Sequence, residues 1–180
     1  MPRKTREDWL HHGLKTLKAS GFEALKAAPM ADSLGVSRGS FYWHFKDLSD
    51  FHTQLIDLWQ ERTTDRIIVE LTNDEAPQIR LRTLVERAVQ SDAQAALDRA
   101  VRRWADQAPT VRARLALVDE KRIGFIADLI SAARGHDRAA SLTRARILYA
   151  ASIGESMIAG PAGTKLTADQ RSALVDLILA

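Results

Sequence analysis

The apolar residues of this chain recur at helical spacing, and no run of Val, Ile and Thr alternates with the period of two that marks a β-strand. The clearest stretch is 110–134, where the steps are three, four and, once, eight residues: Val111, Leu115, Val118, Ile126, Leu129 and Ala133. Ala, Leu, Arg, Asp and Gln dominate the composition and favour helices. Because 46% of the 180 residues are hydrophobic, the chain can bury a core, and the sequence predicts an all-α protein.

Capping and breaking residues divide the chain into helices. Thr5 and Asp8 predict the start of a first helix that ends near Ser20, ahead of Gly21. A second helix is expected over 27–34, a third starts after a Ser37 cap and ends near 41–43, and a fourth starts after an Asp47 cap and continues to about 71. Further helices are expected over 77–91, 93–107, 110–134, 138–159 and 167–179, with a break at 160–163.

The segment 34–46 predicts a helix-turn-helix. A glycine turn at Gly35 joins two helices, and the second of them is short and carries Ser, Arg and Gly in place of core residues. Residues 1–46 hold eight basic and four acidic side chains, so this first quarter has a net charge of +4. Since the whole chain has a net charge of +3, the remainder has a net charge of −1. Such an asymmetry suggests an anionic partner, although ordinary surface charge would also produce it.

The residue types in this segment suit DNA. Ser37 and Ser40 offer hydroxyls, Arg38 can reach a guanine edge or a phosphate, and Gly39 allows close approach of the backbone to a groove. At the helix exit, three further side chains are expected to meet the sugar-phosphate backbone: Tyr42, His44 and Lys46. Trp43 is equally consistent with DNA contact and with covering the module, while Phe41 and Phe45 are expected to be core anchors.

The stretch 35–46 resembles the DNA-binding signature of the TetR family of bacterial transcriptional regulators, in the subgroup with a Tyr-Trp-His-Phe sequence. Residues 21–25 and the Met30-Ala31 pair sit where that family places its first-helix exit and second helix. The resemblance implies a three-helix DNA-binding domain over 1–50, a linking helix to about 71, and a helical ligand-binding and dimerisation domain over 51–180. This sequence departs from the family pattern at Lys26, where the family often has a capping Thr or Ser. The Lys26 side chain can contact a phosphate but cannot cap the helix. The sequence departs again at Leu48, where the family often has Lys.

The resemblance also implies a homodimer that binds a palindromic double-stranded operator, most often as a repressor, and releases it when a small-molecule effector binds. Two apolar faces near the C-terminus fit a dimer interface, or else close the chain's own core. Their members are Ile147, Ala151, Gly154, Ile158, Leu174, Leu177 and Ile178. Four bulky residues are candidates for an effector cavity, with ordinary core as the alternative: Trp104, Phe125, Tyr149 and Met157.

Other classes of protein lack their signatures. The chain has no cysteine and therefore no disulfide framework, and the polar start 1–8 is unlike a signal peptide. No apolar run approaches the ~18 residues of a membrane span, so we expect a soluble cytoplasmic protein. No metal-ligand spacing, phosphate loop or nucleophile motif is present, so no enzyme activity, metal or cofactor is expected. A DNA-binding architectural protein that needs no effector stays open as the alternative function.

Overall fold

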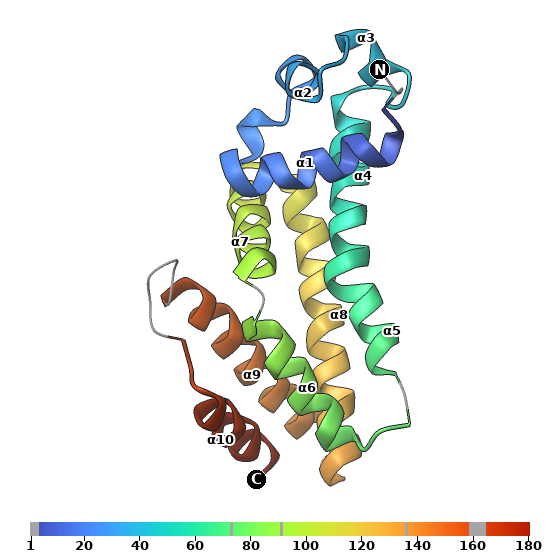
Figure 1. Cartoon of the computed structure of the whole chain (residues 1–180). Coiled ribbons are helices and arrows are strands. Elements are labelled where there is room, and N and C mark those ends of the chain that lie inside the picture. The colour runs from blue at the N-terminus through green and yellow to red at the C-terminus, as the bar shows by residue number, and fades with distance from the viewer. Residues whose placement is uncertain (1–3, 73, 91, 136, 159–164) are drawn as a thin grey trace. The chain divides into compact units, whose positions relative to one another are not determined.

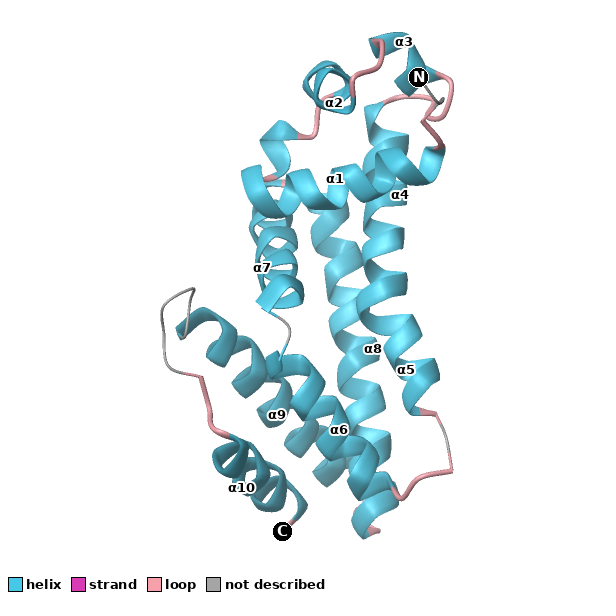
Figure 2. Ribbon diagram, viewed as in Figure 1, coloured by secondary structure: helices cyan, strands magenta, loops and turns pink. Residues whose placement is uncertain are grey.

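Helices make up every regular element that this computed structural model describes (Figure 2), which confirms the all-α prediction. The structure describes residues 4–72, 74–90, 92–135, 137–158 and 165–180. Within these ranges no helix is both long and apolar enough to cross a membrane.

The N-terminal helices begin and end where their capping residues predict. Helix α1 spans Arg6–Ser20 and starts with a capping box, in which Thr5 Oγ1 accepts from the Asp8 amide at 3.1 Å and Asp8 accepts from the Thr5 amide at 2.8 Å. A 3₁₀ turn, η1, spans Phe22–Ala24; α2 spans Ala27–Leu34 and α3 spans Arg38–Tyr42. Helix α4 spans Leu48–Gln60, and the Asp47 carboxylate at its N-cap accepts from the Asp50 amide at 2.8 Å.

The predicted continuous helix from 48 to 71 is interrupted, which corrects that expectation. After α4 the chain forms a π-helical turn, η2, over Glu61–Asp65, and then resumes as α5 over Arg66–Leu71. The Thr63 hydroxyl donates to the Trp59 carbonyl at 2.8 Å, and both Thr63 and Thr64 are buried. A hydroxyl that bonds a carbonyl one turn back competes with the helical ladder, and such sites often bend or widen a helix.

The later helices follow the predicted ranges closely. They are α6 (Pro77–Gln90), α7 (Asp92–Gln107), α8 (Pro109–Arg134), α9 (Arg138–Ile158) and α10 (Ala168–Leu179). Thr167 and Gln170 form a second capping box at the start of α10. The predicted break at 160–163 lies outside the described residues.

The chain divides into two compact units. Unit 1 consists of residues 1–65 and 96–115, and unit 2 consists of residues 66–95 and 116–180. Each unit therefore combines segments that are distant in the sequence. Figure 1 labels the helices of both units. The proposed division of labour between 1–50 and 51–180 is a separate, functional prediction.

The core of unit 1 is aromatic. Phe41 of α3 and Phe45 just beyond it are buried, as predicted, and their ring centroids lie 5.1 Å apart. Phe51 of α4 lies 5.4 Å from Phe41 and 5.0 Å from Phe45, and Trp9 of α1 lies 5.4 Å from Phe41, all in edge-on geometry. These four rings hold the short α3 between α1 and α4.

The second segment of unit 1 is held by polar and aromatic contacts. Trp59 Nε1 donates to Asp98 Oδ1 at 3.2 Å. Trp104 stacks on Phe22, with centroids 6.3 Å apart and planes 6° from parallel, and it meets His52 edge-on at 5.1 Å. Residues 96–115 therefore belong to the same packed body as the N-terminal helices.

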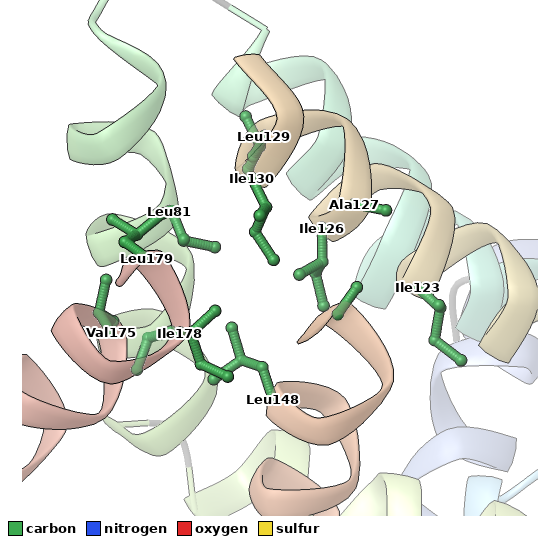
Figure 3. Packing of buried hydrophobic residues seen from close by; sticks show 12 residues of the cluster. Leu81, Ile123, Ile126, Ala127, Leu129, Ile130, Leu148, Val175, Ile178 and Leu179 are labelled. Carbon is green, nitrogen blue, oxygen red and sulfur yellow. The ribbon is translucent and has the colours of Figure 1, made fainter. Parts of the chain in front are cut away.

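Unit 2 has an aliphatic core contributed by α6, α8, α9 and α10 (Figure 3). Its buried members are Leu81, Val85, Ile123, Ile126, Ala127, Leu129, Ile130, Ala145, Leu148, Val175, Ile178 and Leu179. Ile178, predicted at a dimer surface, is 4% exposed and packs in this core instead, because α10 packs against α6 and α9 within its own chain.

Candidate nucleic-acid interface

The turn between α2 and α3 depends on a left-handed glycine. Gly35 has φ +67° and ψ +35°, a conformation that costs other residues about 1–2 kcal/mol. The Gly35 amide donates to the Asp32 backbone carbonyl at 3.1 Å and the Val36 amide donates to the Ala31 carbonyl at 3.0 Å, so the end of α2 is closed by its own backbone. The predicted glycine turn is therefore confirmed, and it redirects the chain into α3.

Helix α3 presents its polar residues outward. Phe41 is fully buried beneath it, whereas Ser37, Arg38 and Gly39 are exposed and Ser40 is half-buried. Ser37 stands at the N-cap, but its hydroxyl makes no capping bond, because the first turn is closed by its carbonyl, which accepts from the Ser40 amide at 2.9 Å. The expectation that the Ser37 side chain caps α3 is wrong, and that hydroxyl faces solvent.

The exposed row continues with Tyr42, the last residue of α3, and with Trp43 and Lys46 beyond it. Tyr42 is 50% exposed and Trp43 is 77% exposed, which is unusual for a large aromatic residue in a folded domain. Arg38 lies over Tyr42, with its guanidinium 5.8 Å from the ring centroid and Nη2 donating to the phenol at 3.4 Å. Lys26 is exposed at the N-cap of α2 without a side-chain capping bond, as its substitution for Ser or Thr predicts.

His44 differs from its neighbours because it is half-buried and bonded within the chain. Its Nε2 lies 2.9 Å from the Lys4 carbonyl oxygen, and since a carbonyl can only accept, Nε2 donates. The bond ties the chain just before α1 to the end of α3. Sequence reasoning missed this placement of Lys4, because nothing local relates residues 40 apart.

The start of α4 is organised by one carboxylate. Asp50 Oδ2 accepts from the Lys46 amide at 2.9 Å and Oδ1 accepts from Gln54 at 2.6 Å. These bonds lower the pKa of Asp50 below its usual value, and the bond from the Lys46 amide has the larger effect. Gln54 in turn accepts from Arg6 Nε at 2.6 Å, so a basic residue of α1 that the sequence did not single out joins this edge.

The four effector-cavity candidates do not gather at one place. Trp104 is 2% exposed and belongs to unit 1, whereas the other three belong to unit 2. Phe125 is half-buried against the aliphatic core, and Met157 is 57% exposed. Tyr149 is half-buried; its phenol donates to Asp119 at 2.6 Å and accepts from Arg122 at 3.2 Å, and burial raises its pKa to about 12.

The dimer-interface candidates are mostly accessible. Ile147 is 56%, Ile158 85% and Leu177 70% exposed, and the smaller Ala151 and Gly154 of α9 are half-buried. Leu174 is partly buried against the core of unit 2. Apart from Ile178, these residues leave an apolar surface on α9 and α10.

No cluster of three metal-ligating side chains occurs among the residues that the structure describes. The exposed groups of the interface are hydroxyls, ammonium and guanidinium groups and aromatic rings. They suit hydrogen bonding and charge pairing with phosphates and base edges better than catalysis.

Comparison with known proteins gives a local sequence match and several matches of fold. No protein-family model matches the sequence. The HTH-type transcriptional regulator AcrR of Shigella flexneri is 34% identical over 56 residues, which is 31% of this chain. The match spans about a quarter of that protein's length (26%).

Two solved structures cover nearly the whole chain. A protein from Saccharomonospora viridis, described as a transcriptional regulator in complex with choline, has a TM-score of 0.79 and 20% identity over 96% of this chain and 94% of its own. A protein from Rhodococcus sp., described as a TetR-family transcriptional regulator, has a TM-score of 0.71 and 19% identity over 97% of this chain and 98% of its own. This protein therefore has the fold of the TetR-family transcriptional regulators.

Proposed function

We propose that this protein is a TetR-family transcriptional regulator that binds a palindromic operator as a homodimer and releases it when a small molecule binds. The observation that carries the proposal is the exposed polar row on α3, held by the buried Phe41 and Phe45 after the left-handed turn at Gly35. A short, rigidly seated helix with outward Ser, Arg and Gly side chains matches the needs of a recognition helix in the major groove.

The roles within the row follow from reach and chemistry. Ser37, Arg38, Gly39 and Ser40 would face base edges, because they occupy the first turn of α3. Tyr42, Trp43 and Lys46 at its exit, with Lys26 at the start of α2, would contact the sugar-phosphate backbone. His44 supports the surface by its bond to Lys4, in addition to any phosphate contact of its ring.

The homodimer and effector parts of the proposal rest on unit 2. The exposed apolar residues of α9 and α10, Ile147, Ile158 and Leu177, offer a surface that a second copy would cover. The choline complex of the Saccharomonospora viridis protein supports a small-molecule effector for this chain. An effector would act through its different affinity for the DNA-binding and released states. In this scheme residues 1–50 bind DNA and 51–180 serve dimerisation and regulation.

Selection of bound duplexes from a random pool tests the DNA-binding proposal. An operator-specific protein should enrich a palindrome and bind it about a thousandfold or more tightly than random duplex at the same salt concentration. Equal affinity for the selected and random duplexes would instead favour an architectural protein that binds by charge.

Two substitutions separate base readout from phosphate contact. Arg38→Ala should relax preference at particular base pairs, by about 1–3 kcal/mol of discrimination. Lys46→Ala should weaken all duplexes alike and reduce the log–log salt slope by about one. Lys18→Ala, which removes an exposed lysine from the far end of α1, is the charge-matched control and should do neither.

A charged substitution on the apolar surface of α9 and α10 tests the proposed dimer. Leu177→Glu should convert a dimer to a monomer in sedimentation equilibrium and abolish palindrome preference, whereas Leu117→Glu, at another exposed leucine of unit 2, should leave both unchanged. A wild-type protein that sediments as a monomer while preferring its palindrome would contradict this part of the proposal.

A further inference from the structure

Unit 1 contains a pocket of about 460 Å³ that none of the DNA-contact predictions uses. Its walls come from the stretch Leu48–Asp57 of α4 and from the corner where α7 ends and α8 begins. The volume lies within the ~300–1,000 Å³ of ordinary small-molecule sites. Four apolar residues form much of the lining: Leu48, Ile56, Trp104 and Val111.

One cation lines this pocket among the described residues. Arg114 of α8 donates from Nη2 to Asp57 Oδ1 of α4, and both side chains are roughly half-exposed. Its Nε, however, is buried and has no hydrogen-bond partner in the described part of the chain. A buried donor without an acceptor is costly, so a rotation of the Arg114 side chain that brings Nε to an acceptor on a ligand in the pocket would be favourable.

The positive charge of the Arg114 guanidinium favours an anionic ligand. The Nε and Nη groups of arginine form a planar fork that matches the two oxygens of a carboxylate. Asp57 engages a single nitrogen of the fork through one oxygen and is exposed enough to turn to water at little cost.

Two other polar side chains of the pocket, His52 and Thr53, are already bonded within the chain. His52 donates from Nε2 to the Leu25 carbonyl at 3.2 Å, and burial lowers its pKa, so the ring is neutral at neutral pH. The Thr53 hydroxyl donates to the Ser49 carbonyl at 3.0 Å. Trp104 is covered by Phe22 and His52, which leaves no open aromatic face for a quaternary ammonium group.

We propose that this pocket binds a small organic carboxylate, with its apolar body against Leu48, Ile56 and Val111 and its carboxylate on Arg114. Such a ligand would connect α4, which carries the DNA-binding helices, to the α7–α8 corner within the same unit. Binding of the carboxylate does not depend on the proposed function. An effect of the carboxylate on operator affinity does rest on the proposed function.

Three probes of one shape and different charge test the site by isothermal titration calorimetry: 1-naphthoate, 1-naphthamide and 1-naphthylmethylammonium. Naphthoate should bind at least about tenfold more tightly than the amide, because a charge-assisted bond to a fork replaces a neutral one. In Arg114→Gln that preference should disappear. Arg146→Gln removes the arginine of an exposed ion pair with Glu120 in unit 2, and as the matched control it should retain the preference.

A second variant tests where naphthoate binds by placing a larger side chain in the pocket. Ala108 lines the pocket, so Ala108→Leu should weaken naphthoate binding about tenfold or more while tryptophan fluorescence shows unit 1 still folded. Tighter binding of the ammonium than of naphthoate would assign the pocket to cations at Asp57. Naphthoate binding that survives both Arg114→Gln and Ala108→Leu would place it elsewhere. No saturable binding of any probe would overturn the inference.

The DNA assay separates this inference from the proposed function. If a palindrome is selected but naphthoate does not bind, the pocket proposal alone fails. If naphthoate binds through Arg114 but no duplex is preferred, the proposed function alone fails. Where both hold, naphthoate should change the affinity of the wild-type protein for its duplex and leave that of Arg114→Gln unchanged.

Discussion

Replacing Gly13 with alanine should destabilise unit 1, although Gly13 lies inside a helix where alanine is the better helix former. A Cβ at this position would lie 2.7 Å from Phe51 Cζ and 2.9 Å from Leu55 Cδ1. Both neighbours are fully buried, and Phe51 is enclosed by Phe41 and Phe45, so neither can move aside. Two overlaps in a close-packed core put the cost near the upper end of overpacking effects, about 3 kcal/mol. The gain in helix propensity returns about 1 kcal/mol, leaving a net loss of about 2 kcal/mol.

Intrinsic fluorescence isolates this effect, because all four tryptophans of the chain, Trp9, Trp43, Trp59 and Trp104, lie in unit 1. Urea unfolding followed by tryptophan emission should give an earlier midpoint for Gly13→Ala than for the wild type. Gly39→Ala is the control: its Cβ would meet nothing closer than Ser37 Oγ at 3.7 Å, so it should be neutral or stabilising by up to about 1 kcal/mol. A Gly13→Ala midpoint equal to or above the wild-type value would refute the packing argument.

Three further changes probe the turn at Gly35, the cap at Asp47 and the half-buried His52, all by the same fluorescence assay. Gly35→Ala should cost about 1–2 kcal/mol through backbone strain alone, because no atom lies within 4 Å of its Cβ, and Gly35→Asn should cost less; equal losses would argue against strain. Asp47→Ala removes the acceptor of the Asp50 amide and should lower the free energy of unfolding by about 1 kcal/mol. Asp47→Ser keeps a capping oxygen and should retain most of that stability. Burial lowers the pKa of His52 below 6.5, so the unfolded chain binds its proton more readily, and stability should fall as pH drops from about 6.5 through the folded pKa. His52→Gln should flatten that dependence, and an unchanged slope would assign it to other groups.

Local signals predicted most helix boundaries, because a cap is a relation between residues three apart. Thr5 with Asp8 and Asp47 with Asp50 make the bonds that their spacing suggests, while the capping box of Thr167 and Gln170 was not predicted. The π-helical turn was not predictable in this way. The apolar pattern across 48–71 suits a continuous helix, and the bond from Thr63 to Trp59 leaves no distinct mark in the sequence.

The candidate DNA-contact surface was predictable for a related reason. Its residues are consecutive, and one left-handed glycine followed by a buried phenylalanine settles which side of α3 faces outward. The position of Lys4 beside His44 was not predictable, because it depends on how α1 packs across the module. The same holds for the pocket of unit 1: Trp104 was a candidate, but its partners His52 and Arg114 come from separate helices.

Unit 1 is assembled from two separate segments of the chain, and this has a consequence for folding during translation. The unit includes residues 96–115, so the helices that carry the candidate DNA-contact row cannot complete their packing when residue 65 has been translated. At ~5–20 residues per second, the stretch 66–115 takes about 2.5–10 s to make. During that time Phe22 lacks Trp104, and Trp59 lacks Asp98. A fragment ending after Asp65 would remain in that incomplete state permanently, so exchange of DNA-binding modules between such proteins should carry both segments together.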